Sequence, residues 1–358
     1  MQLELTYEQL TKQINSEKKI FVVSGKSFEF SGIAQKLKIE KCKIVRFSEF
    51  TENPKLDEVV LGVAQFKKSG AKHILAVGGG TAIDIAKLIK HYSQTLIDSS
   101  ALVPPEAAFL EEVNGILLSV IPTTFGSGSE ATHFAVMYIK GTKFSISGTS
   151  LYPNQYLLDC NLASTLPCKV KASTSLDALC QAIESYWSKG ASIQSRELSA
   201  KAIPMIVRNY FEYVSQSGST SYEIALASHF AGKAINLTKT TAPHALSYFL
   251  TKNYGLAHGH AVALIMIKFF KFHSRLKSNE NLANDMNSLY KLMSCSNCPE
   301  AEELLVNMLR AGGLETSLED LGIKSISSIE KIIKSVNVER LNNHPFEVDD
   351  RILGEVLK

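Results

Sequence analysis

The chain of 358 residues contains no long hydrophobic run. A membrane-spanning helix needs about 18 or more consecutive apolar residues, and the nearest candidates, residues 115–122 and 261–267, fall far short of that length. The first residues, MQLELTYEQLTKQ, include early acidic side chains and lack the apolar segment of a signal peptide. We therefore expect a cytoplasmic protein without a membrane partner.

An excess of charge of one sign is also missing. The chain has 38 Lys and Arg residues against 35 Asp and Glu residues, which leaves a formal net charge of +3. That balance argues against a dedicated nucleic-acid binder. Disorder is excluded because 45% of the residues are hydrophobic and the charges are mixed. The length is sufficient for two domains, each with its own buried core.

Cysteine is scarce, with six residues in the whole chain. Four of them lie among apolar neighbours, and we expect these to be buried, reduced thiols: Cys42, Cys160, Cys168 and Cys180. Cys295 and Cys298 form a CxxC pair, which could begin a zinc site or a redox pair. A structural zinc site needs a second pair of ligands, and the residues after Cys298 include no cysteine and one histidine, His344. We expect the pair to be inert.

The first half of the chain alternates apolar strand-like runs with amphipathic helical stretches, such as residues 55–68. The strand-like runs are apolar on both faces, as buried parallel strands are, and they cover residues 20–25, 42–47, 73–79, 115–122 and 155–159. Alternating strands and helices predict a Rossmann-like parallel sheet with right-handed crossovers.

After Leu166 and Pro167 the pattern changes to helices alone. The helical period is found in residues 171–188, 195–214, 222–236, 260–276, 281–293 and 300–311, and convincing strands are absent. The sequence therefore predicts an α/β domain over residues 1–163 and an all-α domain over residues 164–358. A cleft between two such domains is the usual place for a ligand.

A triple glycine lies between a predicted strand and a predicted helix. Gly78, Gly79 and Gly80 would let a phosphate approach the backbone without meeting a Cβ, and the N–H groups of the following helix would face the anion. Thr81 and Asp84 lie at the start of that helix. Glycines after a strand can equally be turn residues, and the spacing is not that of the GxGxxG fingerprint.

A second loop, residues 121–130, follows another apolar strand and is rich in hydroxyls and glycine. Hydroxyls and exposed backbone donors suit phosphate and ribose contacts. Two such loops at neighbouring strand ends predict a dinucleotide site, and the hydroxyls of this loop that we expect to contribute are Thr123, Thr124, Ser127 and Ser129.

The helical half contains a candidate ligand set for a divalent metal. Asp177 and Gln181 are four residues apart and share one helix face. His244 near the start of a helix, His258 fourteen residues later, and the neighbouring His260 could complete the set. The alternative is that each is a hydrogen-bonded polar residue of the cleft.

Five strings make the chain resemble the iron-containing (group III) alcohol dehydrogenase family. They are GGGTAIDIAK, IPTTFGSGSEAT, SLYPNQYLLD, SLDALCQAIESYW and the His244/His258 pair, and the likeness extends from about residue 20 to residue 345. The resemblance implies the two-domain architecture that this family shares with dehydroquinate synthase. It also implies that the glycine loop takes the pyrophosphate of NAD(P)H and that Asp177, His244 and His258 are metal ligands.

Gln181 departs from the family pattern, because most members carry histidine at the fourth ligand position. An amide oxygen is a weaker and harder ligand than an imidazole nitrogen, so we expect metal affinity to fall and metal preference to shift. Fe2+ or Zn2+ is expected, while nickel, manganese and an empty site remain open.

Within the family, the chain is most similar to the phosphonoacetaldehyde reductase branch. The likeness lies in residues 131–136, in Gln181, and in residues 238–248 and 337–345. It implies reduction of phosphonoacetaldehyde to 2-hydroxyethylphosphonate, a primary alcohol. A phosphonate needs cationic and hydroxyl donors, and the candidates are Lys239, Thr240, His133 and Lys143.

Several points stay open. Lys239 could be a solvated surface lysine and His133 an ordinary strand histidine, and the substrate could be uncharged, as for a general alcohol or lactaldehyde dehydrogenase. A cofactor-binding protein that has lost catalysis is a further alternative. His260 is a possible proton relay, and a homodimer is possible.

The choice between the two cofactors rests on Ser48. Family members that prefer NAD often carry an aspartate there, which would repel a 2′-phosphate. Ser48 removes that carboxylate, although Glu49 could replace it, so the sequence favours NADPH only slightly.

Overall fold

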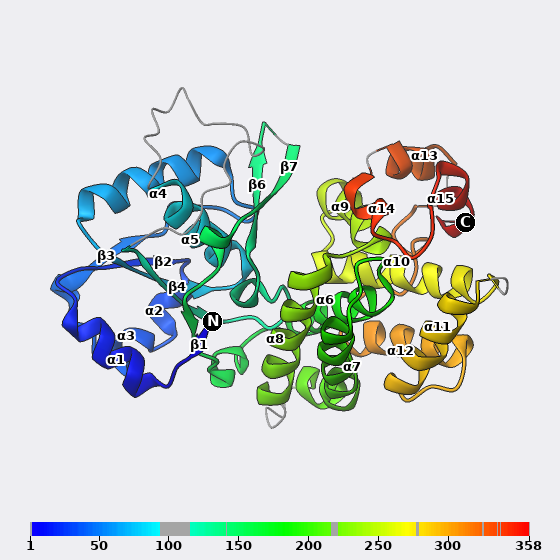
Figure 1. Ribbon diagram of the computed structural model, residues 1–358, viewed down its shortest axis with the longest axis horizontal. Coiled ribbons are helices and arrows are strands. Elements are labelled where there is room, and N and C mark those ends of the chain that lie inside the picture. The colour runs from blue at the N-terminus through cyan, green and yellow to red at the C-terminus, as the bar shows by residue number, and fades with distance from the viewer. Residues whose placement is uncertain are drawn as a thin grey trace. The chain divides into compact units, whose positions relative to one another are not determined.

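The computed structural model describes residues 2–93, 115–140, 142–215, 221–276, 279–323, 326–334, 336 and 338–357. The chain divides into two compact units, shown from blue to green and from green to red in Figure 1. The first comprises residues 1–124 and 129–162, and the second comprises residues 125–128 and 163–358. We call them the sheet unit and the helical unit.

The sheet unit is built on a six-stranded parallel sheet, which confirms the predicted fold class. Its strands, in spatial order, are β1 (Leu3–Glu4), β8 (Gln155–Tyr156), β5 (Leu117–Pro122), β4 (His73–Gly78), β2 (Ile20–Ser24) and β3 (Ile44–Phe47). All neighbouring pairs are parallel. From β2 the chain moves outward to β3 and then returns to β4 on the other side of β2, so the direction of strand order reverses between β2 and β4. In open sheets of this kind, ligands bind at the carboxyl ends of the strands beside that reversal.

Helices cover both faces of this sheet (Figure 1). On one face lie α1 (Tyr7–Ser16), α2 (Ser27–Phe30) and α3 (Ile33–Lys36), and on the other lie α4 (Leu56–Ser69) and α5 (Gly80–Tyr92). Side chains of the central strands alternate between two apolar cores, with Phe21 and Ile74 in the core under α4 and α5, and Ile20 and Leu75 in the core under α1. This explains why the central strands β2, β4 and β5 are apolar at nearly every position.

An antiparallel hairpin in the sheet unit was not predicted. It consists of β6 (Phe134–Ile139) and β7 (Thr142–Ser147). Ala135, Met137 and Ile146 are buried, while most other positions are partly exposed. The β6 strand is an unbroken apolar run like the strands that were found, and it was overlooked, whereas β7 alternates apolar with polar residues over most of its length.

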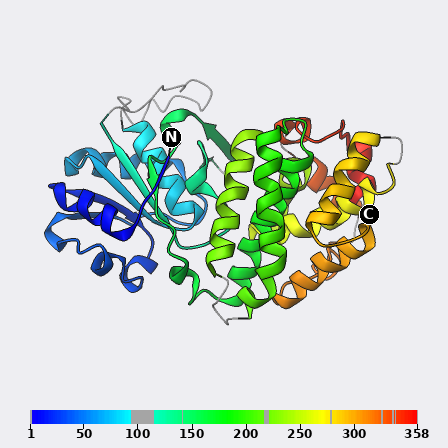
Figure 2. The same cartoon turned by 60° about the horizontal axis from the view of Figure 1, so that its bottom comes forward.

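The helical unit contains no strand among its described residues, as predicted. Its helices are α6 (Cys168–Trp187), α7 (Ile193–Val214), α8 (Ser221–Thr238), α9 (Ala242–Tyr254), α10 (His258–His273), α11 (Glu280–Leu292), α12 (Cys298–Ala311), α13 (Ile326–Lys334), α14 (Val338–Asn342) and α15 (Asp350–Leu357). Figure 2 shows the long helices of this unit side by side. The helices α13, α14 and α15 were not predicted. None of the described helices combines the length and the apolar character needed to cross a bilayer.

Residues 125–128 belong to the helical unit, although the sequence places them in the first domain. A Cβ on Gly126 would lie 2.7 Å from the carbonyl oxygen of Thr174 on α6. A Cβ on Gly128 would lie 2.5 Å from the Cα of Gly232 on α8, and Gly128 has a φ of +59°. Only glycine permits such close backbone approach, so these two residues pack the middle of the hydroxyl-rich loop against the helices.

The six cysteines are free thiols, but only part of the expected burial is found. Cys180 is buried, Cys160 and Cys168 are partly buried, and Cys42 is exposed. Cys42 lies in the short 3₁₀ turn that precedes β3, an edge strand of the sheet. Its apolar neighbours in the sequence therefore do not imply a buried position.

Candidate metal centre and cofactor loops

One face of α6 carries three buried polar side chains at consecutive helical turns. They are Asp177, Gln181 and Glu184, at positions i, i+4 and i+7. Residues with this spacing lie above one another on a helix. Burying two carboxylates is costly unless partners compensate them, and the partners come from α9, from Thr241 directly before it, and from α10.

Asp177 meets two histidines from those helices. Its Oδ1 lies 3.3 Å from Nε2 of His244, at the start of α9, and 3.9 Å from Nε2 of His258, the first residue of α10. The candidate ligand atoms of the three residues all lie within 4.8 Å of one another. One carboxylate oxygen and two imidazole nitrogens at this spacing can close around one divalent cation and leave a coordination position for substrate.

Gly259 explains why α10 can begin so close to Asp177. A Cβ at this position would lie 1.9 Å from the carbonyl oxygen of Ser173 and 2.8 Å from the backbone nitrogen of Asp177. Any other residue would push the start of α10 away from α6. The ring of His258 is further fixed by Tyr248, which stacks on it at 5.5 Å between ring centres and 12° between planes.

Glu184 is a functional residue that the sequence analysis missed. Its Oε1 accepts hydrogen bonds from the backbone N–H and the hydroxyl of Thr241, both at 2.9 Å, and from the backbone N–H of His244 at 3.2 Å. Its Oε2 pairs with Nδ1 of His244. A carboxylate that holds the Nδ1 proton leaves Nε2 as the metal-facing atom, the usual arrangement behind a ligating histidine. The spacing i+7 from Asp177 is the signal that could have identified it.

The charges of this cluster shift the pKa values of its members. Burial alone would lower the pKa of His244, but the carboxylates of Glu184 and Asp177 outweigh it and raise that pKa to about 10. Burial would raise the pKa of Asp177, but the hydrogen bond from His244 and the charge of His258 outweigh it and lower that pKa. The cluster therefore stabilises positive charge, which a proton or a metal ion can supply.

Gln181 fits the donor set of a metal site. Its Nε2 donates to the carbonyl oxygen of Ser127 at 3.5 Å, while its buried Oε1 has no hydrogen-bond partner among the described residues. Buried acceptors without partners are uncommon in folded proteins. The amide also donates to Asp177, and turning the amide over would present its oxygen to a cation beside that residue.

His260 does not join the cluster. Its Nε2 donates to the carbonyl oxygen of Glu315 at 2.8 Å, and burial lowers its pKa. Residues two apart on a helix point in nearly opposite directions, so His258 and His260 cannot both face Asp177. The sequence motif alone did not distinguish the two histidines.

In the sheet unit, the glycine loop and the threonine pair lie side by side. Gly78 and Pro122 are register partners at the ends of β4 and β5. The backbone N–H of Thr123 donates to the carbonyl oxygen of Gly78 at 3.0 Å. A Cβ on Gly79 would lie 2.9 Å from Oγ1 of Thr124. Gly80 begins α5 and is followed by Thr81, so free N–H groups of that helix face the same strand ends.

Asp84 and Ser129 bind each other, which directs both of them toward the protein. The Ser129 hydroxyl donates to Asp84 Oδ1 at 2.5 Å, and Asp84 Oδ2 accepts from the backbone N–H of Val136 at 2.9 Å. Lys87, which is fully buried, donates to Ser129 Oγ at 2.9 Å and to Thr132 Oγ1 at 3.0 Å. These hydrogen bonds hold the segment after β5 in place, and through them Asp84 and Ser129 bind other protein groups.

The four residues expected at the substrate lie in two places. Lys239 is exposed on the turn between α8 and α9 with a φ of +64°, and the neighbouring Thr240 is buried. In the sheet unit, His133 lies just before β6 and Lys143 lies on β7, both partly buried. Ser48 is exposed directly after β3, at the edge of the sheet where the strand ends lie.

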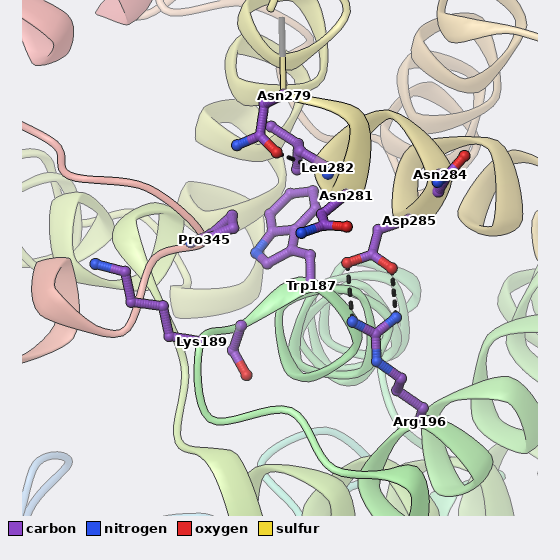
Figure 3. A pocket seen from close by; sticks show the side chains of 10 residues that line it. Trp187, Lys189, Arg196, Asn279, Asn281, Leu282, Asn284, Asp285 and Pro345 are labelled. Carbon is purple, nitrogen blue, oxygen red and sulfur yellow. Dashed lines mark hydrogen bonds and ion pairs between the residues drawn. The ribbon is translucent and has the colours of Figure 1, made fainter.

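A polar cavity of about 440 Å³ in the helical unit contains none of the predicted site residues (Figure 3). Its walls include Trp187, Lys189 and three asparagines of the α11 region. The side chains of Arg196 and Asp285 form a two-pronged ion pair there. Because Arg196 is neutralised by Asp285, Lys189 is the cation of the lining that this pair leaves.

Comparison with known proteins places the chain in a family. The family model described as iron-containing alcohol dehydrogenase matches residues 4–160, and the model of the C-terminal domain of the Fe-containing alcohol dehydrogenase family matches residues 171–351. In sequence, 4-hydroxybutyrate dehydrogenase from Clostridium kluyveri is 31% identical over 290 residues, which cover 77% of this chain and 76% of that protein.

Two further relatives bear on the substrate. Phosphonoacetaldehyde reductase from Streptomyces viridochromogenes is 29% identical over 239 residues, which cover 63% of this chain and 59% of that protein, less than two thirds of its length. The structure of sulfoacetaldehyde reductase from Bifidobacterium kashiwanohense, solved in complex with NAD+, covers 99% of this chain and 95% of that chain with a TM-score of 0.86 and 24% identity. That likeness supports the fold. The chain belongs to the iron-containing alcohol dehydrogenase family, whose members are oxidoreductases that act on alcohols.

Proposed function

We propose that the protein reduces a small aldehyde to a primary alcohol with NAD(P)H and a divalent metal ion held by Asp177, His244 and His258. The observation that carries this proposal is the cluster of these three residues, of which Asp177 and His244 are buried, with Glu184 behind His244. In the net reaction, the aldehyde takes a hydride from NAD(P)H and a proton from water, which gives the alcohol and NAD(P)+. Since His260 binds the Glu315 carbonyl, we assign no proton transfer to it.

The residues of the helical unit prepare the site for the metal. A divalent cation bound there supplies Lewis acidity, which polarises a carbonyl group and stabilises a developing alkoxide. Glu184 keeps the proton of His244 on Nδ1, and Asp177 supplies the negative charge. Gln181 contributes its amide oxygen as a fourth donor. Fe2+ or Zn2+ is the expected occupant.

The cofactor is proposed to bind at the carboxyl ends of β4 and β5. Gly78, Gly79 and Gly80 would accept the pyrophosphate, with Thr123 and Thr124 beside it. Ser127 is a further candidate donor for the nicotinamide ribose. The relative solved with NAD+ supports a nicotinamide cofactor, and the absence of an acid at Ser48 favours NADPH slightly over NADH.

The substrate is proposed to be phosphonoacetaldehyde, a two-carbon aldehyde with an anionic end. Three relatives support an anionic substrate, since their names specify 4-hydroxybutyrate, phosphonoacetaldehyde and sulfoacetaldehyde. Lys239 is exposed on the turn that precedes the helix of His244, and His133, Lys143 and Thr240 are the further candidates. The second candidate is an uncharged substrate, which the likeness to 1-propanol dehydrogenase and lactaldehyde reductase favours. We also propose a cytoplasmic location, and we leave a homodimer open.

The substrate is tested by comparing kcat/KM for phosphonoacetaldehyde and propanal with each cofactor and with Fe2+ or Zn2+. We expect phosphonoacetaldehyde to be preferred at least a hundredfold. Lys239→Ala should lower its kcat/KM about tenfold, by removing one charge-assisted contact, and should leave propanal unaffected. Lys252→Ala, at an exposed lysine of α9, is the matched control. A preference for propanal would establish the uncharged substrate instead, and no turnover of any aldehyde by the metal-loaded protein would establish a loss of catalysis.

The fourth ligand is tested by Gln181→His in a chelator titration with Zn2+. Imidazole is the stronger ligand for this ion, so we expect the variant to bind Zn2+ about tenfold more tightly than the parent protein. An unchanged affinity would show that the side chain at this position does not ligate.

A further inference from the structure

Asn343 lies in a segment near the C-terminal end that neither the metal ligands nor the cofactor loops account for. The segment follows α14, which contacts α9, the helix that begins beside His244. Asn343 is partly buried, and its side chain spans two other segments of the helical unit. The string that contains it was one of the strings by which the chain resembles the phosphonoacetaldehyde reductase branch.

The amide of Asn343 uses both its donor and its acceptor. Its Nδ2 donates to the carbonyl oxygens of Thr238 at 2.7 Å and Thr240 at 3.1 Å. Its Oδ1 accepts from the backbone N–H of Gly190 at 3.2 Å, and its own carbonyl oxygen accepts from the backbone N–H of Lys189 at 2.9 Å. No other side chain of this size supplies two donors and an acceptor in one plane.

The turn that Asn343 holds is one that needs support. It covers residues 238–241, between the end of α8 and the start of α9. Carbonyl groups at the end of a helix have no partner within that helix, and Lys239 adopts a left-handed conformation that non-glycine residues avoid. Asn343 supplies partners to the carbonyl groups on both sides of Lys239.

The same turn fixes the support behind His244. Thr241 directly precedes α9, and its backbone N–H and hydroxyl both bind Glu184. The Thr241 hydroxyl also accepts from Nε1 of Trp187 at 3.1 Å. Glu184 in turn binds Nδ1 of His244, whose Nε2 faces Asp177. Asn343 is therefore connected to the metal-facing nitrogen in three steps. It binds the carbonyl oxygen of Thr240, the next residue Thr241 binds Glu184, and Glu184 binds the ring of His244.

We propose that Asn343 is a positioning residue of the metal centre, which fixes the 238–241 turn and, through Thr241 and Glu184, the orientation of His244. This inference rests on the proposed metal site. The turn and Asn343 also contact two residues that line the cavity of Figure 3. Trp187 binds Thr241, and Lys189 binds the backbone of Asn343.

The test replaces Asn343 by aspartate. Asn343→Asp keeps the shape and the acceptor for Gly190, but it places a carboxylate oxygen against the carbonyl oxygens of Thr238 and Thr240. We expect the affinity for Co2+, measured by chelator competition, to fall at least tenfold. The visible spectrum of bound Co2+, which reports ligand geometry, should change. In the metal-free protein, the proton NMR signal of the His244 Nδ1–H group should shift, because its bond to Glu184 is altered.

Three variants make the outcome decisive. Asn342→Asp introduces the same charge at the exposed neighbouring residue and should stay within twofold of the parent. Leu289→Ala removes a buried side chain of α11 and controls for a general loss of stability. Asn343→Ser, which keeps one donor, should give an intermediate loss and replaces the aspartate variant if that variant does not fold.

The results separate this inference from the proposed function. If the parent protein binds no Co2+, or binds it as well after Asp177→Ala, the metal site is wrong and the role of Asn343 is wrong with it. If the parent protein binds Co2+ through Asp177 and Asn343→Asp binds it equally well, only the role of Asn343 is wrong. A loss of affinity no larger than that of Leu289→Ala, at an equal fall in melting temperature, would also overturn it.

Discussion

The sheet unit and the helical unit offer a ligand different kinds of chemistry. The strand ends of the sheet unit present backbone, since the triple glycine and the threonine pair lie close together where β4 and β5 end. The helical unit presents buried ionisable side chains, each held by a partner, as His244 is held by Glu184. The first site depends on close approach and the second on compensated charge. The two sites should therefore fail in different ways when residues are replaced.

The largest effect is expected from Asp177→Ala. This change removes the carboxylate that both histidines face, so His258 loses its carboxylate partner and only Glu184 remains beside His244. We expect metal content to fall to background and kcat/KM to fall at least a thousandfold, because loss of the ion removes the polarisation of the carbonyl. Metal analysis and a stopped-flow assay of NAD(P)H oxidation measure both quantities.

The same variant tests whether the two sites are separable. Cofactor affinity, measured by fluorescence of bound NAD(P)H, should change by less than threefold. Asp57→Ala, at an exposed aspartate of α4, should alter neither metal content nor turnover. Unimpaired aldehyde reduction by Asp177→Ala would show that the reaction does not need the metal. A large loss of cofactor affinity would show that the two sites do not act independently.

A large effect on stability is expected at Lys87, the buried cation of the sheet unit. Burial lowers the pKa of Lys87 from 10.5 to about 8, against the attraction of Asp84 and Glu130. The unfolded chain therefore binds more protons than the folded chain between these pH values, and stability should rise with pH across this window. A fall in pKa of this size corresponds to about 3 kcal/mol as an upper limit.

The measurement compares urea unfolding of the parent protein with that of Lys87→Met between pH 7 and pH 10.5. Methionine does not titrate. The unfolding free energy of the parent protein minus that of Lys87→Met should therefore increase as pH rises. A difference that is independent of pH would mean that Lys87 keeps its proton throughout, held by Asp84 and the hydroxyls of Ser129 and Thr132.

The sequence predicts the elements whose burial is continuous. The inner strands of the sheet are apolar at nearly every position, and the helical period is clear in α6, α7, α8, α10, α11 and α12, so these elements were found. The β6 strand is an equally apolar run that was overlooked, β7 is mostly polar, and β1 has two residues. Residues 125–128 were assigned to the first domain because nothing in the sequence shows which helices Gly126 and Gly128 approach.

Only those residues of the candidate site that spacing or the family resemblance indicates could be predicted from the sequence. Asp177, His244 and His258 were singled out, and the structure brings them together. Glu184 was missed because its importance comes from contacts with a helix 60 residues away in the sequence. Conversely, His260 was included because it lies next to His258 in the sequence, while the helix turns it toward Glu315.

A moderate effect is expected from Glu184→Gln, which keeps the size of the side chain. The amide can still accept from Thr241, but its NH2 group cannot accept the Nδ1 proton of His244. The proton then moves to Nε2 and blocks the atom that faces Asp177. We expect metal affinity to fall about 10- to 100-fold, measured by chelator competition with Zn2+.

Glu303→Gln, at an exposed glutamate of α12, is the matched control for the charge change. It should leave metal affinity unaltered. An equally tight site in Glu184→Gln would show that the carboxylate serves only to hold the start of α9, through Thr241 and the backbone of His244.

The smallest effect is expected from Gly79→Ala, which tests the backbone character of the sheet unit. The new Cβ would lie 2.9 Å from Oγ1 of Thr124, so the threonine must rotate away and the loop must open slightly. We expect the Kd for NAD(P)H to rise about tenfold while metal content stays constant, the reverse of the pattern for Asp177→Ala. Gly354→Ala is the control, because a Cβ there meets nothing within 4 Å on α15. Cofactor affinity equal to that of the parent would place the dinucleotide elsewhere, and a loss of metal would mean that the two sites are coupled.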